Sequence, residues 1–392
     1  MTEQLDALVI GAGPAGLMAA HELALAGRKV VIVDAKPSVG RKFLMAGKSG
    51  LNLTKDEPLD QLLPHYAASA DRLRPMLTHF DPAAIQNWAI GLGQPVFTGT
   101  SGRVFPTAMK ASPLLRAWLE QLRGLSVDIR PRHHWTGWDN GTYVFDVMGD
   151  TVGLRPKVTV LALGGASWSR LGSDGKWTNM VEDMGAQTIP FAPSNVGLAV
   201  QWSPFMTKHF GQPIKGVALH AGNVVERGEF VITEPGLEGG GIYAMSAALR
   251  DGHPLFLDLM PDWSINKITM RLNTTKSGDS MVNRLRKALR LDPAKLALLM
   301  EFARPLPDIA GLATIIKRLP VQHTGFRPMD QAISTVGGIA WDSLDEHLMV
   351  KSSPGTFVAG EMIDWDAPTG GYLLTACLAT GKWAGQNAAG WQ

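Results

Sequence analysis

The sequence has a single cysteine, Cys377, among its 392 residues. One thiol permits no intrachain disulfide, no Cys-x-x-Cys redox pair and no cysteine-rich zinc site, so a reducing, cytoplasmic location is expected. No apolar run reaches the roughly 18 residues that a membrane-spanning helix requires. The first residues carry two acids and no basic stretch before a short apolar run, which is not the pattern of a secretion signal. We therefore expect neither a disulfide scaffold nor a membrane protein.

An excess of charge is also missing. The net charge is +2, and only 18% of the residues are charged. This balance argues against a protein coated in basic residues, although it says nothing about local patches. Between residues 265 and 304, nine Lys and Arg residues outnumber three Asp and Glu residues. A solvated helix face is the simpler interpretation of this basic segment, and a docking surface for an anionic partner, including RNA, is the alternative.

Glycine, by contrast, is abundant, with 43 residues and no collagen-like period. The first cluster, Gly11-Ala12-Gly13-Pro14-Ala15-Gly16, follows an apolar strand-like run and precedes a run of helix formers. This order of strand, glycine turn and helix is the dinucleotide-binding fingerprint. In it, Gly11 allows the tight turn, Gly13 lets the backbone approach a pyrophosphate, and Gly16 lets the helix pack on the strand.

A second strand, expected over residues 29–33, ends at Asp34. An acid at this place hydrogen-bonds a ribose hydroxyl in dinucleotide-binding folds. A helix N-terminus after the glycine turn supplies N–H groups and partial positive charge for the phosphates. These features predict nucleotide binding, but they do not by themselves separate FAD from NAD.

Three further segments favour FAD. Residues 40–54 form a glycine-rich, basic stretch that could fold over a long dinucleotide, although a solvated loop is the plainer interpretation. Two later strands end in Gly164-Gly165 and in Gly360-Glu361, and Glu361 could hold ribityl hydroxyls. A helix expected over residues 373–389 could stabilise negative charge on a reduced flavin through its N-terminal dipole. No second glycine fingerprint follows for a resident nicotinamide, so NAD(P)H would have to visit transiently.

Several motifs together resemble one known family, the BaiN/YhiN-type FAD-dependent flavoproteins, which include proteins grouped as NAD(P)/FAD-dependent oxidoreductases and as an aminoacetone oxidase family. The resemblance spans nearly the whole chain and rests on the first glycine cluster and on residues 40–44, 101–106, 337–338, 359–364 and 370–372. It implies an oxidoreductase with tightly but noncovalently bound FAD. It also places the adenine near Trp135, in a strand pair expected over residues 127–138. The motifs and the resemblance together predict these FAD-binding residues: Gly11, Gly13, Pro14, Ala15, Gly16, Asp34, Ala35, Arg41, Lys42, Ser49, Gly50, Asn52, Trp135, Gly164, Gly165, Gly360, Glu361, Gly370, Gly371, Tyr372 and Leu373.

The sequence departs from this family in two loops. Where the wider family carries Gly-x-Gly-Arg-Cys-Asn, this chain keeps Asn52 but has Gly50 and Leu51 in place of arginine and cysteine. A cap loop of the type Thr-His-x-Gly-x-Ser-Gly-Pro is replaced here by residues 233–241. The chain therefore resembles a divergent branch. Because YhiN-type proteins are linked to reduction of a uracil in ribosomal RNA, an RNA-base-modifying flavoenzyme is an alternative function, and a flavin-binding sensor or assembly protein is a non-enzymatic one.

The nucleotide-binding motifs lie at both ends of the chain, which predicts a domain split by an insertion. We expect an α/β fold with a Rossmann-like FAD-binding domain of the glutathione-reductase type, formed by residues 1–190 and 325–392. The insertion divides by pattern into a β-rich cap domain at 191–262 and a small helical subdomain at 263–324.

Candidate catalytic groups must reach the flavin ring, because a flavin supplies its own redox chemistry. Lys48 lies in the loop expected near the ring and could stabilise anionic reduced flavin, although a phosphate or surface lysine is as good an interpretation. Glu238, in a glycine-rich cap segment, could act as acid or base, and a turn residue is the alternative. Arg103 could bind a substrate anion or form a structural salt bridge. The adjacent His133 and His134 would point to opposite faces of a strand, so no metal is predicted.

Overall fold

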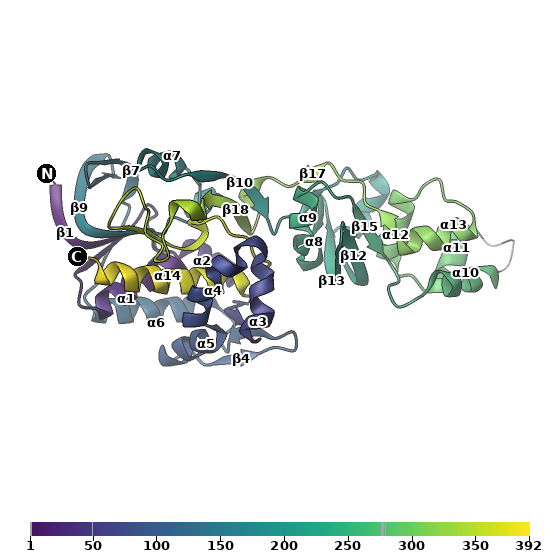
Figure 1. Cartoon of the computed structure of the whole chain (residues 1–392). Coiled ribbons are helices and arrows are strands. Elements are labelled where there is room, and N and C mark those ends of the chain that lie inside the picture. The colour runs from purple at the N-terminus through teal and green to yellow at the C-terminus, as the bar shows by residue number, and fades with distance from the viewer. Residues whose placement is uncertain (1, 49, 276–277, 279) are drawn as a thin grey trace. The chain divides into compact units, whose positions relative to one another are not determined.

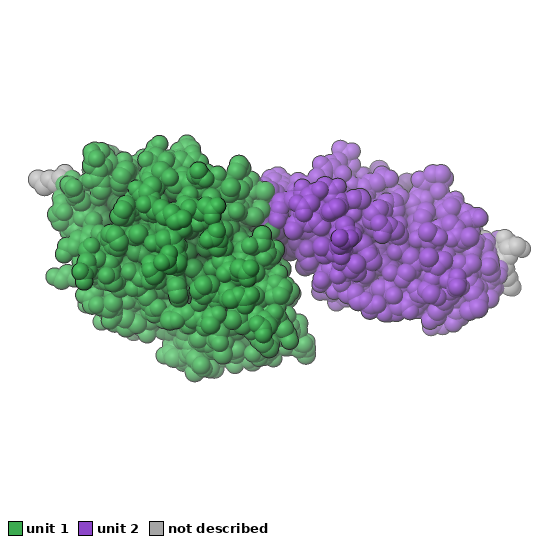
Figure 2. Space-filling view, in the orientation of Figure 1, with its two compact units in different colours: residues 1–192, 333–392 green, residues 193–332 purple. Residues whose placement is uncertain are grey.

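The computed structural model describes residues 2–48, 50–275, 278 and 280–392. It divides the chain into two compact units, coloured separately in Figure 2. Unit 1 comprises residues 1–192 and 333–392, and unit 2 comprises residues 193–332. The expected boundaries near 190 and 325 lie close to these limits. The further split of the insertion at 262 stays a prediction, and both of its parts contribute side chains to one hydrophobic cluster.

Unit 1 is built on a sheet in the order β6-β2-β1-β9-β8-β7, with β19 pairing with the end of β9. The central strands β1, β2, β6, β9 and β19 run parallel, whereas β7, β8 and the start of β9 form an antiparallel meander. The strands are β1 (Thr2–Ile10), β2 (Val30–Asp34), β6 (Asp128–Pro131), β7 (His134–Asp139), β8 (Thr142–Val147), β9 (Asp150–Leu161) and β19 (Thr356–Val358).

Burial explains the parallel core of this sheet. Residues 7–10 of β1 and 30–33 of β2 are all buried, as parallel strands covered on both faces require. Their continuous apolar runs are the strand signals seen in the sequence, and the predicted strand at 29–33 is confirmed within one residue. The parallel strands also bring the carboxyl ends of β1, β2 and β9 to one edge of the sheet, where ligands bind in open α/β folds.

Two helices dominate the packing on this sheet, α1 (Pro14–Leu25) and α14 (Tyr372–Gly390), and they pack against each other (Figure 1). Glycines of α14 allow the close approach: a Cβ on Gly381 would lie 2.3 Å from the carbonyl oxygen of Ala15. The other helices of unit 1 are α2 (Arg41–Ala46), α3 (Leu59–Leu62), α4 (Ala70–His79), α5 (Pro82–Gly91), α6 (Ala111–Gly124) and α7 (Thr178–Asp183).

Small sheets complete unit 1. Strands β3 (Thr54–Lys55), β5 (Arg103–Pro106) and β4 (Val96–Thr98) form an antiparallel group, and β10 (Thr188–Ser194) pairs with β18 (Ser334–Ile339). The expected strand pair at 127–138 is wrong in one respect. Strand β6 pairs with β2 and β7 pairs with β8, so the two lie at opposite edges of the sheet. The resemblance implied a strand pair here, whereas each strand extends a different edge of the sheet.

Unit 2 contains an antiparallel sheet in the order β16-β15-β12-β13-β14-β11-β17, covered by helices. Its apolar face and the helices share one buried cluster that includes Leu219, Leu257, Leu298 and Ile316. The strands are β11 (Leu198–Ala199), β12 (Pro213–Ala221), β13 (Val224–Thr233), β14 (Gly236–Glu238), β15 (Leu255–Asp258), β16 (Leu319–Pro320) and β17 (Gly325–Phe326). The helices are η3 (Pro204–His209), α8 (Gly240–Ala244), α9 (Ser246–Arg250), α10 (Ile265–Asn273), α11 (Met281–Leu289), α12 (Pro293–Phe302), α13 (Ile309–Lys317) and η4 (Met329–Gln331).

Candidate functional site

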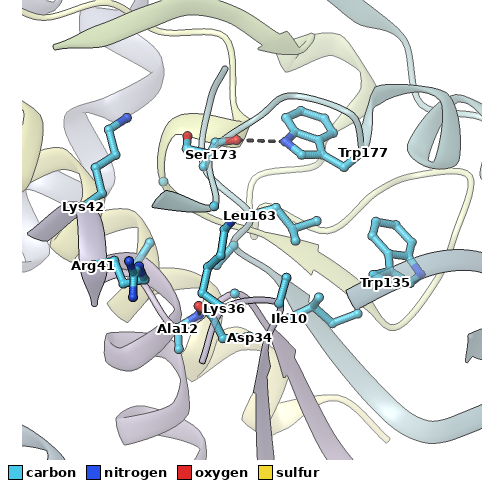
Figure 3. A pocket seen from close by; sticks show the side chains of 18 of the residues that line it. Ile10, Ala12, Asp34, Lys36, Arg41, Lys42, Trp135, Leu163, Ser173 and Trp177 are labelled. Carbon is cyan, nitrogen blue, oxygen red and sulfur yellow. Dashed lines mark hydrogen bonds between the residues drawn. The ribbon is translucent and has the colours of Figure 1, made fainter. Parts of the chain in front are cut away.

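A cavity in unit 1 opens at the carboxyl ends of β1, β2 and β9 (Figure 3). Its walls come from segments far apart in the sequence: the β1–α1 turn, the end of β2, the start of α2, the start of β7, the loop after β9, and α14. Twelve of the predicted FAD-binding residues line it, namely Gly11, Gly13, Pro14, Ala15, Asp34, Ala35, Arg41, Lys42, Trp135, Gly164, Gly360 and Glu361. The fold therefore brings most of the predicted residues together.

The glycine turn has the geometry that a phosphate site requires. Gly11 has a φ of +103°, and a Cβ there would lie 2.3 Å from the carbonyl oxygen of Ala162. A Cβ on Gly16 would lie 1.9 Å from the carbonyl oxygen of Gly11, so α1 can start here only with glycine. A Cβ on Gly13, in contrast, would meet no protein atom within 4 Å. The protein is closed around Gly11 and Gly16 and open at Gly13, where backbone can approach a ligand.

Asp34 ends β2 with its carboxylate held in place. Oδ2 accepts a hydrogen bond from the N–H of Ala12 at 3.0 Å, and Oδ1 accepts one from the N–H of Lys36 at 2.8 Å. Burial raises the pKa of this carboxyl above its ordinary value, while these N–H groups and the charge of Lys36 favour the ionised form. The remaining lone pairs of the carboxylate can accept hydrogen bonds from ribose hydroxyls.

A half-buried ion pair lies on the cavity wall. The Nζ of Lys42 donates to Oε2 of Glu361 at 2.8 Å and to Oγ of Ser167 at 2.9 Å. Cys377 of α14 also lines this wall. Burial, and secondarily the charge of Glu361, raises the pKa of its thiol well above the ordinary value, so the thiol stays protonated. Cys377 was not predicted as a site residue, because its neighbours in α14, Ala376 and Leu378, are apolar.

Aromatic side chains line another part of the cavity (Figure 3). Trp135, at 3% exposure, and Trp177 both line it, together with His133 and His134. The two histidines are not both in a strand, because β7 begins only at His134, and both line the cavity. Trp177, Lys36 and the histidines were not predicted as site residues, since no motif marks them. Over the described residues, no cluster of three or more His, Cys, Asp or Glu side chains could hold a metal ion.

Seven buried side-chain polar atoms find no hydrogen-bond partner within the described part of the chain, and two of them are Nε of Arg41 and Oδ1 of Asn52. Buried donors and acceptors usually have partners, and Arg41, unlike the other residues with an unpaired atom, lines the cavity, where a bound ligand could supply one. Both residues are among those predicted to bind FAD. Together with the glycine cradle and Asp34, they show that the residues present fit a long dinucleotide.

Other predicted residues lie outside the cavity wall. Gly16 and Gly165 pack against protein atoms, and Ser49 lies outside the described residues. Gly370 and Gly371 directly precede α14, and Tyr372 and Leu373 begin it; Tyr372 is five residues, about 7.5 Å along the helix axis, from Cys377. Gly50 and Asn52 lie in the segment between α2 and β3. A flavin ring at the start of α14 therefore stays a prediction.

Charged and aromatic side chains surround that helix start. The Oη of Tyr372 donates to Oε1 of Glu57 at 2.7 Å, and the rings of His65 and Tyr372 lie 4.3 Å apart. Burial, and then the hydrogen bond to Glu57, raises the pKa of Tyr372 well above its ordinary value, so the phenol is neutral. Arg103 is exposed and lies against Gly370, where a Cβ would be 3.1 Å from its Nε. No carboxylate of the described residues forms an ion pair with Arg103, so the salt-bridge alternative lacks a partner here.

The two predicted catalytic residues are not in the cavity wall. Lys48 is exposed and lines a neighbouring groove with Gly47 and Lys110. Glu238 lies at the end of β14 in unit 2, where its carboxylate forms an ion pair with Arg327. The glycine-rich segment that carries Glu238 forms a paired strand. The ion-pair partner of Glu238, Arg327, lies 89 residues later in the chain, so residue spacing could not predict the pair. Both catalytic assignments stay predictions.

Fewer cations of the basic segment at 265–304 are free to bind an anionic partner than its net charge suggests. Lys295 donates to the carbonyl oxygens of Gly216 and Leu259, and Arg284 donates to the carbonyl oxygen of Leu272 at 3.2 Å. These two side chains hold backbone inside unit 2. Lys276 lies outside the described residues. The exposed cations of α11 and its end are Arg286, Lys287 and Arg290.

Comparison with known proteins gives three findings. A family model described as "HI0933-like protein Rossmann domain" matches residues 5–387. The chain is similar to the "Ribosomal RNA dihydrouridine synthase" of Escherichia coli (strain K12), with 25% identity over 392 aligned positions that cover 94% of each chain. It is also similar to the "3-dehydro-bile acid delta(4,6)-reductase" of Clostridium scindens, with 24% identity over 420 aligned positions that cover 97% of this chain and 98% of that one.

A solved structure shares the fold. The open conformation of a flavocytochrome c3 fumarate reductase has a TM-score of 0.53 and 16% identity, and the match covers 99% of this chain and 78% of that one. In the part of this chain that the structure describes, no helix is both long and apolar enough to cross a membrane.

Proposed function

The chain belongs to the HI0933-like family of FAD-dependent oxidoreductases, and we propose that it reduces a carbon–carbon double bond next to a carbonyl group, with NADH or NADPH as a visiting hydride donor. The names of both curated relatives describe this chemistry. Dihydrouridine is a uracil nucleoside saturated beside a carbonyl, and a delta(4,6)-reductase saturates double bonds. The observation that carries the flavin part of the proposal is the cavity lined by the glycine turn and Asp34, together with the Nε of Arg41, which has no partner among the described residues.

Residues of unit 1 would hold FAD along this cavity. The open backbone at Gly13 and the N-terminus of α1 would receive the pyrophosphate, and Asp34 would accept from ribose hydroxyls. Trp135 and Trp177 offer apolar surface for the adenine. Glu361, fixed by Lys42, would accept from ribityl hydroxyls. When bound, the flavin supplies two-electron transfer between a nicotinamide donor and an organic acceptor.

Reduction of a conjugated double bond also needs a proton at the carbon beside the carbonyl group. Tyr372 is a neutral phenol at the start of α14, and Glu57 and His65 connect it to the solvent side of the cluster. Arg103 is exposed beside Gly370 and has no ion-pair partner among the described residues, so it can orient the substrate's carbonyl oxygen or an acidic group. The proposed proton donor is therefore Tyr372, in a chain that has Leu51 where the wider family carries a cysteine.

Reoxidation of the reduced flavin tests this proposal. The purified holoprotein is reduced without oxygen by NADPH and mixed with 2-cyclohexenone, uridine or a steroid 4,6-dien-3-one. At least one conjugated acceptor should restore the flavin absorption band, whereas saturated cyclohexanone should not. Tyr372→Phe should slow reoxidation by about 10²-fold or more without changing reduction by NADPH. A matched control is Tyr143→Phe, because Tyr143 is another buried tyrosine of unit 1 and bonds Thr356 at 3.0 Å.

Two results would contradict the proposal. If no conjugated acceptor reoxidises the flavin faster than buffer does, the protein does not reduce conjugated double bonds of this class of substrate. If Tyr372→Phe and Tyr143→Phe reoxidise at the wild-type rate, Tyr372 is not the proton donor, and Lys48 becomes the next residue to replace.

A second candidate function is reduction of an RNA base. The exposed cations Arg286, Lys287 and Arg290 at α11, together with the name of the relative from Escherichia coli, favour it. Binding to oligouridylate should then weaken steeply with salt, and the double variant Arg286→Ala/Lys287→Ala should reduce the salt slope by about 2. Lys215→Ala, at an exposed lysine paired with Glu229, is the control. Affinity unchanged in the double variant would contradict RNA binding at this surface.

A further inference from the structure

A groove in unit 2 plays no part in the FAD cavity, and it shares only Arg286 with the RNA-binding surface considered above. It lies among η3, α11 and α12 and has a volume of about 590 Å³. Its apolar lining comes from Met206, Leu291, Pro293, Leu296, Ala297 and Met300. Phe205, 75% exposed, stands at its rim. The groove thus combines an apolar lining with a concave shape, which is the usual form of a small-molecule site.

Internal hydrogen bonds fix the shape of the groove. Oε1 of Glu301 accepts from the N–H of Ser203 at 2.7 Å, and Oε2 accepts from its hydroxyl at 2.6 Å. These bonds tie the start of η3 to α12. The rings of Trp202 and Phe302 lie 5.7 Å apart beneath this connection. The groove is therefore formed without a ligand, and little order has to be gained when one binds.

The charges on the groove are unbalanced. Lys208, Arg286 and Arg304 line it and are exposed. Among the described residues, none of these cations forms an ion pair with a carboxylate; Arg286 donates only to the amide oxygen of Asn283. The acid in the lining, Glu301, is already engaged by Ser203. An apolar floor thus adjoins positive charge that no described acid neutralises.

We propose that this groove binds a small amphipathic anion, a carboxylate, sulfate or phosphate group on an apolar body such as an acyl chain. Its volume falls in the range of about 300–1,000 Å³ that small-molecule sites occupy. The apolar body would cover the floor, and the acidic group would contact Arg304 and Lys208. This second site is independent of the flavin chemistry, so it can exist whether or not the proposed reduction does.

Displacement of a fluorescent amphipathic anion tests the site. 8-Anilinonaphthalene-1-sulfonate is bound to the FAD-loaded protein, and decanoate is added as competitor. Decanoate should displace the probe, whereas decanol, which lacks the charge, and acetate, which lacks the apolar body, should compete at least about tenfold less well. Single-stranded oligouridylate and vesicles of phosphatidylglycerol serve as alternative competitors.

Three variants locate the binding. Lys208→Ala/Arg304→Ala should weaken decanoate about tenfold while decanol is unaffected. Ala297→Trp should fill the floor and prevent binding of both compounds. Lys215→Ala, an exposed lysine of unit 2 outside the groove, should change nothing. Unchanged flavin absorption and unchanged far-UV circular dichroism show that a variant is folded.

The outcomes separate the proposal from its alternatives. Equal displacement by decanol and decanoate, or no effect of the double variant, would show an apolar surface without anion recognition and overturn the proposal. Displacement by oligouridylate or vesicles but not by decanoate would assign the surface to a nucleic acid or a membrane, which also overturns it. Retained binding in folded Ala297→Trp would place the ligand elsewhere.

Discussion

Gly13→Ala should weaken FAD binding without disturbing the packing of the protein itself. A methyl group at Gly13 meets no protein atom within 4 Å, and the backbone there, with φ −83° and ψ −176°, is one that alanine adopts readily. Gly16, three residues later, is the opposite case, because its Cβ would lie 1.9 Å from the carbonyl oxygen of Gly11. The same change, glycine to alanine, therefore tests cofactor binding at Gly13 and protein packing at Gly16.

The expected magnitudes follow from these contacts. For Gly13→Ala, a poorer N-cap and a stiffer unfolded chain nearly offset, so the apoprotein's free energy of unfolding should change by less than about 1 kcal/mol. A methyl group in the path of the pyrophosphate should cost about 1–3 kcal/mol of binding, which weakens FAD roughly 5-fold to 150-fold. Gly16→Ala should instead destabilise the apoprotein itself by at least about 1–3 kcal/mol.

Two assays on flavin-stripped protein distinguish the variants. Chemical unfolding gives the stability of the apoprotein, and quenching of flavin fluorescence gives the dissociation constant of FAD. If Gly13→Ala binds FAD within about twofold of wild type, the open side of Gly13 does not receive the cofactor and the reasoning is refuted. Wild-type stability of Gly16→Ala would refute the packing argument.

Three further predictions concern charge. Glu22 is 6% exposed, and burial alone would raise its pKa. Hydrogen bonds from Lys382 and Gln386, together with the nearby His21 ring at 3.6 Å, lower the pKa from 4.5 to about 2, so Glu22→Gln should cost about 3 kcal/mol of unfolding free energy near neutral pH. Because the folded-state pKa is the lower one, this difference should shrink as the pH falls from 4.5 towards 2 in denaturant titrations, and a constant difference would be contrary evidence. Asp34→Ala should weaken FAD at least about tenfold by fluorescence titration, and wild-type affinity would exclude its ribose role. Arg284→Ala should lower the stability of unit 2 by about 1–3 kcal/mol in chemical unfolding and Arg286→Ala by less than about 0.5, whereas equal losses would contradict their different contacts.

Local sequence signals predicted the centre of unit 1 well. The glycine turn, the apolar runs of β1 and β2 and the acid at Asp34 depend on residues within one short stretch, and backbone sterics leave few alternatives to them. The resemblance drawn from separate motifs is confirmed by a family model over residues 5–387. The Rossmann-like fold and FAD as cofactor are confirmed with it.

Features that depend on distant partners could not be predicted in the same way. Glu238 pairs with Arg327, and the two residues share no spacing pattern that sequence alone reveals. Counting charges overestimated how many cations of the segment 265–304 can bind a partner, because Lys295 and Arg284 donate hydrogen bonds to backbone carbonyl oxygens. The strand pair expected at 127–138 was wrong, because β6 and β7 pair with β2 and β8 at opposite edges of the sheet, and sequence alone does not show which edge is available.

The anaerobic absorption spectrum of the purified protein tests the central claim most directly. The account predicts a flavin band equivalent to one FAD per chain, bleached by NADH or NADPH and restored by a conjugated carbonyl compound. A colourless protein that takes up no added FAD, or a bound flavin that neither donor reduces, would contradict it.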